Sequence, residues 1–360
     1  MKIVVILPGY SNKPIGGYKV AFDYAEHLAC QTPVKVHILY QPIRTELPDA
    51  GWAGKKAAIA RQTIHAAAVR AACGRHMCWR SLNPAISTHM SLSAIDKLGL
   101  NSSDAVIATA ATTAFTAARI KSIYGARGFY FLQHVEEWLV GADLLQNSYE
   151  LPLRKIAVAP WIREYLKRLG FSQCDVVMNA IDATDYTGGP PLAERFEVGT
   201  LLAPGNPEKG TPIAIEVLNR LAELRIPVQS FGTCKRPANL DRRVRHYSNP
   251  APATLRDFYH RTKVFFCSSL TEGFGLAPAE AALSGAAVVS TRNGGVEAYG
   301  EGFVRFCDST AAAITEAIID VYRDPQILGP HFQQKVHEFG SYTPETAATN
   351  FAELILQSNH

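Results

Sequence analysis

The chain has 360 residues, of which 47% are hydrophobic and 19% are charged. This length allows two domains with separate cores, and the composition is that of an ordinary soluble globular protein. The formal net charge of +4 is modest, and no apolar run approaches the ~20 residues that a membrane-spanning helix needs, which argues against an integral membrane protein.

The chain starts with a pattern typical of a strand. Residues 1–8 are apolar but too short for a signal peptide, so we expect a cytoplasmic protein. Seven cysteines are scattered along the chain, without a Cys-x-x-Cys motif or a His/Cys cluster of zinc-like spacing. We therefore expect reduced cysteines and no bound metal.

The first half alternates strand and helix patterns. After a strand at 2–7, a loop with Gly16-Gly17 leads into a helix at 18–29, whose apolar residues have helical spacing. Further strands are predicted at 34–40, 105–109, 129–132, 155–159 and 175–178, and further helices at 113–124 and 160–169. Such alternation predicts a parallel sheet with helices on both faces.

One segment of the first half is strongly basic. Residues 50–95 contain no Asp or Glu, but they include Lys55, Lys56, Arg61, Arg70, Arg75 and Arg80. A pair of solvated helices with basic faces would explain this pattern. Alternatively, the segment contacts an anionic acceptor, the inner face of a membrane or, as the weakest alternative, a nucleic acid.

The second half repeats the alternation after a break. Residues 182–198 contain Thr-Asp-Tyr-Thr-Gly-Gly-Pro-Pro, a turn-rich run that predicts a linker between domains. The elements predicted after it are a strand at 200–203, a helix at 211–224, a strand at 228–231 and a helix at 253–261. After a strand at 303–307 only helices are expected, the last of them at 344–356.

The most informative stretch runs from Phe266 to Val289. Two apolar strand patterns, at 264–267 and 287–290, enclose a helix-length segment rich in Ala, Leu and Glu, which predicts a βαβ unit. Ligands of such units bind beyond the carboxyl ends of the strands, where residues 271–276 fall. The sequence therefore places a binding loop at 271–276.

The residues of this loop suit a sugar nucleotide. Gly273 and Gly275 let the backbone approach a ligand, and N–H groups at the helix start near Leu276 attract a phosphate. Glu280 can accept two hydrogen bonds from the vicinal diol of a ribose, while Glu272 stays in the loop for a second polyol. Each Glu alone would equally suit an exposed surface, but the joint pattern predicts a site for an activated sugar.

The run Glu-Gly-Phe-Gly-Leu-x-Pro-x-Glu-Ala at 272–281 resembles the signature loop of the family 4 retaining glycosyltransferases. The resemblance implies the GT-B fold, an α/β architecture of two Rossmann-like, doubly wound parallel-sheet domains facing a central cleft. It also implies that Glu272 contacts the donor sugar and that Glu280 holds the ribose. The backbone amides of Phe274, Gly275 and Leu276 would contact sugar and phosphate.

The same resemblance implies that the two domains bind different substrates. Residues 1–185 would bind the acceptor and residues 186–341 the nucleotide-sugar donor. The C-terminal helix, within 342–360, would pack back on the first domain.

A second loop at 204–210, Pro-Gly-Asn-Pro-Glu-Lys-Gly, is similar to the family's Gly-Arg-x-x-x-x-Lys-Gly turn. By this similarity Lys209 would hold the donor diphosphate and stabilise the leaving group, whose negative charge grows in the transition state. Pro204 stands where the family has Arg, which favours a replacement cation from a neighbouring loop. The candidates are Lys235, Arg236 and Arg292.

Three features of the first half complete the expected site. Gly16-Gly17 resembles the family's Gly-Gly loop, at which acceptor and donor phosphate approach the backbone. His134 follows a predicted strand and corresponds to a family His beside the donor sugar, and Glu136 is a weaker candidate for acceptor contact. The runs at 18–20 and 133–136 are similar to a rhamnosyltransferase-like branch of the family.

Other nucleotide and metal motifs are absent from the sequence. It contains no Asp-x-Asp, no Walker-type Gly-x-x-x-x-Gly-Lys-Ser/Thr, and no Gly-x-Gly-x-x-Gly after the first strand. We therefore expect a metal-independent enzyme without a cofactor, in which Lys209 and the helix terminus stabilise the leaving group.

The resemblance implies a retaining hexosyltransferase of polysaccharide or glycoconjugate synthesis. Its donor would be a UDP-, dTDP- or GDP-linked hexose or deoxyhexose, and its acceptor a hydroxyl of a glycan, a lipid-linked glycan or another molecule. One alternative is a nucleotide-sugar 2-epimerase, which shares the two-domain architecture. A second alternative is a non-catalytic module that binds sugar nucleotides, which Pro204 favours.

Overall fold

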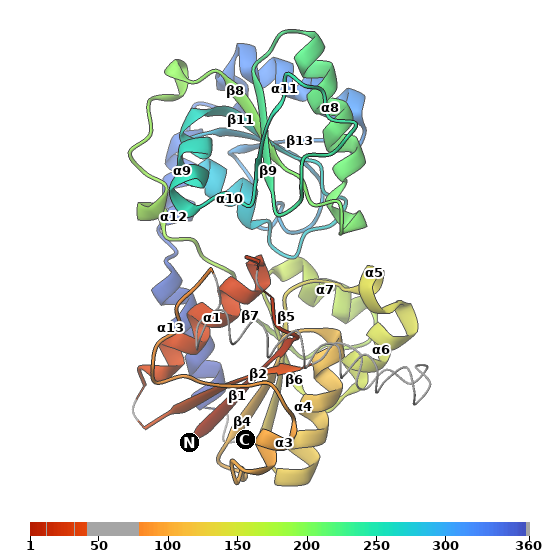
Figure 1. Cartoon of the computed structure of the whole chain (residues 1–360), viewed down its shortest axis with the longest axis vertical. Coiled ribbons are helices and arrows are strands. Elements are labelled where there is room, and N and C mark those ends of the chain that lie inside the picture. The colour runs from red at the N-terminus through yellow and green to blue at the C-terminus, as the bar shows by residue number, and fades with distance from the viewer. Residues whose placement is uncertain (12, 32, 42–78, 358–360) are drawn as a thin grey trace. The chain divides into compact units, whose positions relative to one another are not determined.

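The computed structural model describes residues 1–11, 13–31, 33–41 and 79–357. The chain divides into two compact units (Figure 1): unit 1 comprises Met1–Asn179 and Glu345–His360, and unit 2 comprises Ala180–Pro344. Most of the predicted cationic segment, including Lys55, Lys56, Arg61, Arg70 and Arg75, lies outside the described residues. Within the part of the chain that the structure describes, no helix combines the length and hydropathy needed to span a bilayer.

Unit 1 is built on a seven-stranded parallel sheet in the order β3-β2-β1-β4-β5-β6-β7. The strands are β1 (Lys2–Pro8), β2 (Lys35–Gln41), β3 (Ser87–His89), β4 (Ala105–Ala108), β5 (Arg127–Leu132), β6 (Arg154–Ala157) and β7 (Cys174–Val176). Strand β1 pairs with both β2 and β4, so the strand order reverses between β1 and β4. The loops that follow these two strands occupy the position where sheets of this kind bind ligands.

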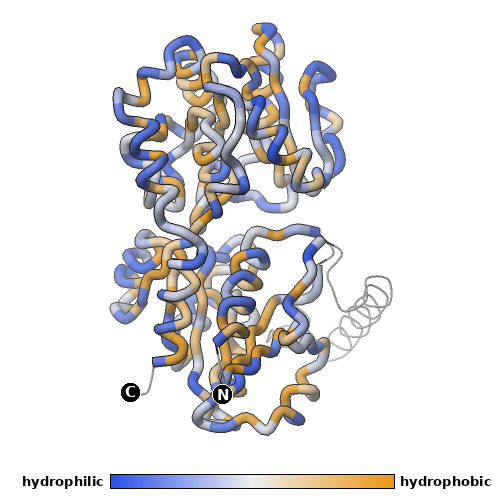
Figure 2. The backbone as a smooth tube through the Cα atoms, turned by 90° about the vertical axis from the view of Figure 1, so that its left-hand side faces the viewer, coloured by the Kyte–Doolittle hydropathy of each residue, from blue (hydrophilic) through white to orange (hydrophobic). Residues whose placement is uncertain are grey.

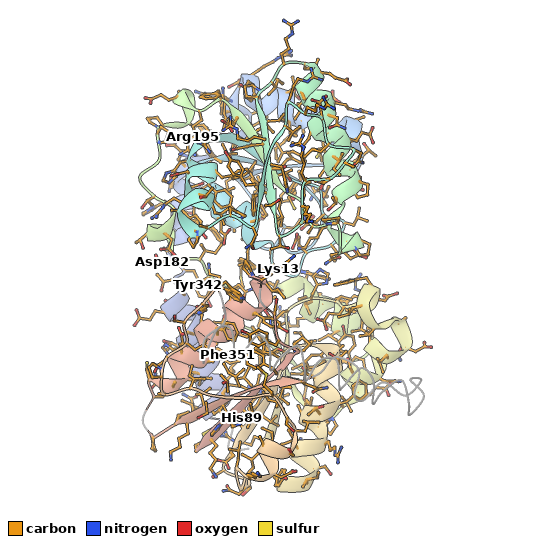
Figure 3. All side chains as sticks on the ribbon, viewed as in Figure 1. Lys13, His89, Asp182, Arg195, Tyr342 and Phe351 are labelled. Carbon is orange, nitrogen blue, oxygen red and sulfur yellow. The ribbon has the colours of Figure 1, made fainter. Side chains whose placement is uncertain are left out.

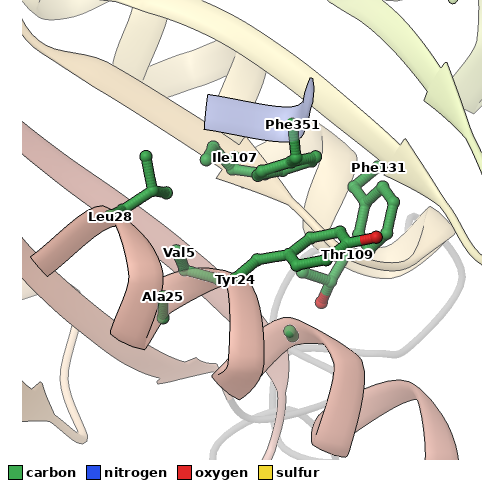
Figure 4. A pocket seen from close by; sticks show the side chains of 9 residues that line it. Val5, Tyr24, Ala25, Leu28, Ile107, Thr109, Phe131 and Phe351 are labelled. Carbon is green, nitrogen blue, oxygen red and sulfur yellow. The ribbon is translucent and has the colours of Figure 1, made fainter. Parts of the chain in front are cut away.

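Helices cover both faces of this sheet (Figure 1). They are α1 (Gly16–Ala29), α3 (Ser93–Asp96), α4 (Ala111–Tyr124), α5 (Glu137–Val140), α6 (Ala142–Glu150), α7 (Pro160–Arg168) and α13 (Pro344–Leu356). Phe351 of α13 stacks on Tyr24 of α1 (ring centroids 4.6 Å apart) and packs edge-on against Phe131 of β5 (5.0 Å). Figure 4 shows these three rings around a small apolar pocket of unit 1.

Ion pairs and hydrogen bonds join distant parts of unit 1. The guanidinium of Arg127 donates to the carbonyl of Ile355 (2.9 Å) and to Sδ of Met1 (3.3 Å), so it links the two ends of the described chain. Arg80, from the predicted cationic segment, pairs with Asp23 (2.6 Å) and Glu26 (2.7 Å) of α1. Its charge is therefore compensated within unit 1.

Unit 2 contains a six-stranded parallel sheet in the order β10-β9-β8-β11-β12-β13. The strands are β8 (Glu197–Leu201), β9 (Val228–Gly232), β10 (Arg245–Ser248), β11 (Thr262–Cys267), β12 (Ala287–Thr291) and β13 (Val304–Cys307). The helices are α8 (Thr211–Glu223), α9 (Pro252–Arg261), α10 (Leu276–Leu283), α11 (Ala311–Arg323) and α12 (Phe332–Gly340). Here the strand order reverses between β8 and β11, which pair directly.

The core of unit 2 follows from residue alternation along its strands. Val264 and Phe266 pack under α8 and α11, while Phe265, which points to the other face, meets Tyr259 of α9. Figure 2 shows apolar and polar residues alternating along the helices of both units, as expected when each buries one side. The two α/β domains, each with a parallel sheet, confirm the predicted fold class.

Buried Arg195 (Figure 3) connects helices α9 and α10 with the segment that precedes β8. Its guanidinium donates to the carbonyls of Pro190 (2.8 Å), Tyr259 (3.3 Å) and Ser284 (2.5 Å). These acceptors lie before β8, in α9 and directly after α10. Arg195 therefore holds α9 and α10 in a fixed relation.

Candidate functional site

Two loops meet where the strand order of unit 2 reverses. One follows β8 and ends at Lys209 in a short 3₁₀ turn, and the other follows β11 and carries Glu272. Lys209 Nζ lies 2.6 Å from Glu272 Oε2, although 63 positions separate these residues in the sequence. The structure thus pairs the cation and the carboxylate that the sequence assigns to diphosphate and sugar.

Glu272 is buried and hydrogen-bonded on several sides. The hydroxyl of Ser269 donates to Oε1 (2.7 Å), and the Glu272 amide donates to the carbonyl of Asn293 (3.0 Å). Lys209 and Glu272 also line a small pocket, together with Thr200, Leu201, Phe265, Phe266, Cys267, Ser268, Ser269, Ala277 and Pro278. Burial, and then the charge of Glu272, raise the pKa of the Cys267 thiol, so this cysteine stays protonated near neutral pH.

Backbone contacts hold the two loops together. Glu208 accepts hydrogen bonds from the Leu270 amide at its carbonyl (2.7 Å) and from the Thr271 hydroxyl at its carboxylate (2.8 Å). Gly210 has a φ of +58°, and a Cβ there would overlap the carbonyl oxygen of Ser268. The close approach of the loops therefore depends on glycine at position 210.

The glycine-bearing loop is closely packed where it enters α10. Gly275 has a φ of +87°, and a Cβ there would lie 2.8 Å from Cγ2 of Val296. The Tyr299 hydroxyl donates to the Gly275 carbonyl (2.8 Å), and the buried ring of Phe274 packs on Tyr299. Because the first amides of a helix have no partner within it, the start of α10 at Leu276 presents donors to a ligand of this loop.

Glu280 lies in the second turn of α10 and is only 9% exposed. Its Oε2 accepts a hydrogen bond from the hydroxyl of Tyr259 (2.8 Å). Burial, and then Glu280, raise the pKa of Tyr186, which places a second tyrosine beside this carboxylate. The sequence did not point to these tyrosines, because Tyr259 lies in the predicted helix at 253–261 and Tyr186 lies in the turn-rich linker.

Three cations were candidates to replace the arginine that the family has at the position of Pro204, and their surroundings in the structure differ. Arg236 donates to the carbonyls of Val244 (2.6 Å) and Leu240 (3.2 Å), so its guanidinium holds its own loop together. Arg292 pairs with Glu297 (3.0 Å) and lies over the Phe306 ring. Lys235 is exposed. Since the other two are engaged, Lys235 is the strongest candidate.

In unit 1, Gly16-Gly17 forms the first turn of α1 and not the predicted loop. A Cβ at Gly17 would come 3.0 Å from the side-chain oxygen of Gln133, which follows β5. The pair therefore allows α1 to approach the end of β5. This is close packing of the kind for which glycine is required, at the edge where β1 and β4 end.

His134 and Glu136 also follow β5. Nδ1 of His134 donates to the carbonyl of Val135 (2.7 Å), which leaves Nε2 as the acceptor of the neutral ring. Glu136 Oε2 accepts from the Ala111 amide (2.6 Å) at the start of α4. Burial raises the pKa of Glu136 to about 7, although this hydrogen bond opposes the shift.

Among the described residues, no three His, Cys, Asp or Glu side chains gather in a group that could hold a metal ion. The polar centre of unit 2 is instead the Lys209–Glu272 pair with its neighbouring amides. This arrangement can stabilise an anion through Lys209 and accept hydrogen bonds from hydroxyl groups through Glu272 and Glu280.

The comparisons with known proteins address the fold and unit 2. Residues 195–324 match the model of the family described as glycosyl transferases group 1. All of the matched residues fall within unit 2. The matched region includes Lys209, Glu272 and Glu280, whereas no curated protein sequence matches the chain.

Solved structures match almost the whole chain. Sucrose-phosphate synthase from Thermosynechococcus elongatus is 14% identical, with a TM-score of 0.74 over 99% of this chain and 98% of that one. Anabaena Alr3699/HepE, in complex with UDP and glucose, is 17% identical, with a TM-score of 0.69 over 99% and 100%. The catalytic domain of Arabidopsis thaliana starch synthase IV, bound to ADP and acarbose, is 12% identical, with a TM-score of 0.66 over 99% of each chain. These matches show the GT-B fold.

Proposed function

We propose that the chain is a nucleotide-sugar glycosyltransferase, which moves a hexose or deoxyhexose from a nucleoside diphosphate to an acceptor hydroxyl. The observation that supports this most directly is the Lys209–Glu272 pair at the strand-order reversal of unit 2. A cation for the leaving diphosphate and a carboxylate for the sugar hydroxyls occur together there, in the domain that matches glycosyl transferases group 1.

Each group has a proposed role. Lys209 and the amides of Gly273, Phe274, Gly275 and Leu276 neutralise the diphosphate, which favours departure of the leaving group without a metal ion. Glu272 binds hydroxyls of the transferred sugar, and Glu280 binds the ribose. The donor thus belongs to unit 2.

We assign the acceptor to unit 1. There the Gly16-Gly17 turn allows backbone approach, His134 is the candidate catalytic side chain, and Glu136 is the candidate acceptor contact. Retention of the anomeric configuration by front-face attack requires no strong general base, because the leaving phosphate oxygen can take the acceptor's proton. A glycan, a lipid-linked glycan or a smaller hydroxyl compound are the acceptors to be tried.

A ligand screen followed by a reaction tests the function. Thermal shift with UDP, GDP, dTDP and ADP identifies the nucleotide, and the matching nucleotide sugars are then incubated with and without acceptor hydroxyls. Transfer, with the product anomer assigned by NMR, supports the proposal. Epimerised donor without acceptor would identify an epimerase, and binding without transfer or hydrolysis would identify a binding module.

Lys209→Ala tests the diphosphate role in the same assay. We expect turnover to fall by roughly 10²-fold or more, because a stabilising charge is removed from the developing anion. Lys335→Ala is the matched control, since Lys335 pairs with Glu338 on α12 and lies outside the proposed site. Undiminished turnover of Lys209→Ala would contradict the assignment.

A further inference from the structure

Aromatic side chains meet at the carboxyl-terminal edge of the unit 1 sheet. The loop after β5 carries His134, whose ring lies edge-on to that of Trp161, with the ring centroids 6.4 Å apart and an angle of 84° between the planes. Trp161 belongs to the first turn of α7, shortly after β6 ends. Since β5 and β6 pair side by side, their carboxyl ends bring the two rings together.

The loop after β5 also reaches the point where the strand order of unit 1 reverses. The Ala111 amide, at the start of α4, donates to Glu136 Oε2 (2.6 Å). Helix α4 follows β4, which pairs with β1 across the reversal. The loops after β4 and β5 therefore meet at the position where sheets of this kind bind ligands.

Trp138 adds a second indole to this edge. It lies on α5, which begins at Glu137 directly after the loop, and it is 37% exposed. Trp161 is partly buried. An indole is the largest flat apolar side chain, and contact between its ring and water is unfavourable compared with contact with an apolar surface. A ligand that presents a flat apolar face would therefore gain by covering these rings.

A sugar ring combines such a face with hydrogen-bond donors. The C–H groups on one side of a pyranose form a small apolar patch, and its hydroxyl groups project from the rim. The patch can lie on an indole while the hydroxyls donate to nearby carboxylates, for which Glu136 and Glu137 are in place. An alkyl chain would cover the indole equally well, but it would offer nothing to these carboxylates.

The charge of this region favours an uncharged ligand. Residues 128–153, which carry Trp138, contain four carboxyl side chains and no Lys or Arg. On α7, Arg163 pairs with Glu164 (3.4 Å). An anionic membrane surface, a nucleic acid or a phosphorylated sugar would be repelled by a segment of this charge. A neutral saccharide would not be.

We infer that Trp161 and Trp138 form a stacking subsite for an uncharged saccharide acceptor at the carboxyl-terminal edge of unit 1. This inference rests on the proposed function, in which unit 1 binds the acceptor. It narrows the acceptor to sugars whose ring at the site carries no phosphate or carboxylate. Glu136 and Glu137 accept hydrogen bonds from the hydroxyls of that ring.

Saccharide binding to the full chain, without a donor, tests the inference. The probes are the methyl glycosides of glucose, galactose, mannose and rhamnose, followed by calorimetry and by tryptophan fluorescence. We expect at least one glycoside to bind and to change the fluorescence. Trp161→Ala should weaken this binding ~10-fold and Trp138→Ala roughly 3-fold, because each removes an apolar surface on which the sugar lies.

A control on the same helix separates stacking from loss of structure. Leu169 is 42% exposed and follows the opposite end of α7, so Leu169→Ala should leave saccharide affinity unchanged. Trp138 is exposed on a four-residue helix, so Trp138→Ala provides a test even if Trp161→Ala does not fold. A purely structural role of either tryptophan would lower the melting temperature without changing saccharide affinity.

A matched pair of sugars tests the charge preference. The neutral sugar that binds best is compared with its uronic acid, which differs by one carboxylate. We expect the uronic acid to bind roughly 3–10-fold more weakly, because the carboxylates of this edge repel it. Glu137→Gln should reduce this difference.

The outcomes separate the inference from the function beneath it. The inference is wrong if no neutral glycoside binds, or if both tryptophan variants keep the full affinity. Tighter binding of the uronic acid, or of vesicles of phosphatidylcholine with phosphatidylglycerol, would also overturn it and would identify an anionic ligand or a membrane instead. Nucleotide binding and transfer to another acceptor would survive each of these results. If a saccharide binds but no nucleotide does, the proposed function is wrong, and with it the role of the saccharide as acceptor.

Discussion

At the residue scale, the ion pair between Lys209 and Glu272 joins the residue proposed to bind the diphosphate to the residue proposed to bind the transferred sugar. In the ligand-free protein each charge neutralises the other across 2.6 Å, and the Glu272 side chain is buried. Under the proposed function, a nucleoside diphosphate would therefore compete with Glu272 for Lys209. The carboxylate would then favour the transfer through its contact with the sugar, and it would oppose the binding of a nucleotide that has no sugar.

This competition predicts opposite effects of one substitution. Glu272→Gln should bind the nucleoside diphosphate roughly 3–10-fold more tightly, because Lys209 loses its competing anion. Transfer should fall by roughly 10-fold or more, because the contact with the sugar loses its charge. Calorimetry and turnover assays measure the two effects. Glu208→Gln, which removes a neighbouring carboxylate bound to Thr271, should leave both unchanged, and weaker nucleotide binding by Glu272→Gln would contradict the prediction.

Glu136 should make stability depend on pH. Its folded-state pKa of about 7 lies above the ordinary value of 4.5, so between these limits the folded state retains a proton that the unfolded state has released. The free energy of unfolding should therefore fall by roughly 1–3 kcal/mol as the pH rises from about 4.5 to 7. Glu136→Gln should lack this component.

Urea unfolding at about pH 5 and about pH 8 measures this effect as the difference between the parent protein and Glu136→Gln. The comparison with the parent is needed because burial lowers the pKa of His37 to about 4, which by itself makes stability rise between about pH 4 and 6.5. Equal pH dependence in the two proteins would show that Glu136 titrates normally.

At the element scale, the loops after β8 and β11 can approach each other only because of Gly210. In Gly210→Ala, a methyl group would overlap the Ser268 carbonyl and the residue would hold an unfavourable positive φ. We expect a loss of about 2–4 kcal/mol in the free energy of unfolding and a weakened Lys209–Glu272 pair. Gly205→Ala, in the same loop but in open space, should cost little. Chemical denaturation of both variants distinguishes these cases.

Elements with a strong apolar pattern could be predicted from the sequence. Elements that contain buried polar residues were harder to predict, because the partners of those residues lie elsewhere in the chain. The β11–α10–β12 unit was predicted within about two residues at each end, because its apolar runs are continuous. Strand β8 begins at Glu197, three residues before the predicted start. A buried glutamate hides this start in the sequence, and its partner Arg245 lies across the sheet.

Two of the four edge strands, β3 and β10, were missed for a related reason. Strand β10 reads Arg-His-Tyr-Ser, and β3 has three residues, so neither shows an apolar pattern. Lys209, Glu272 and Glu280 were proposed as site residues from local motifs, and their roles remain predictions. The contacts of Glu280 with Tyr259 and Tyr186 could not be predicted, because they depend on how α9 and α10 pack.

At the scale of the whole molecule, α13 makes unit 1 depend on residues that follow unit 2 in the sequence. Phe351 is 2% exposed and packs between Tyr24 and Phe131. Phe351→Ala should therefore lower the stability of unit 1 by about 3–5 kcal/mol. Unit 2 has a separate core, so its ability to bind a nucleotide should survive.

The distribution of tryptophan allows the two units to be followed separately. All four tryptophans of the sequence, at 52, 79, 138 and 161, fall in unit 1. In Phe351→Ala, thermal unfolding monitored by tryptophan fluorescence should shift to lower temperature, while calorimetric nucleotide binding at low temperature stays intact. Leu218→Ala, in the core of unit 2, should show the reverse pattern. Loss of both signals in both variants would show that the units unfold together.

The position of α13 also has a consequence for biosynthesis. A ribosome delivers residues 180–344 before it delivers Phe351, so the later-starting unit can finish folding first. The earlier-starting unit has to wait, with the rings of Tyr24 and Phe131 uncovered, until the helix that covers them has emerged. During that interval the nascent chain would expose the apolar surface formed by Tyr24 and Phe131, which is the kind of surface that chaperones bind.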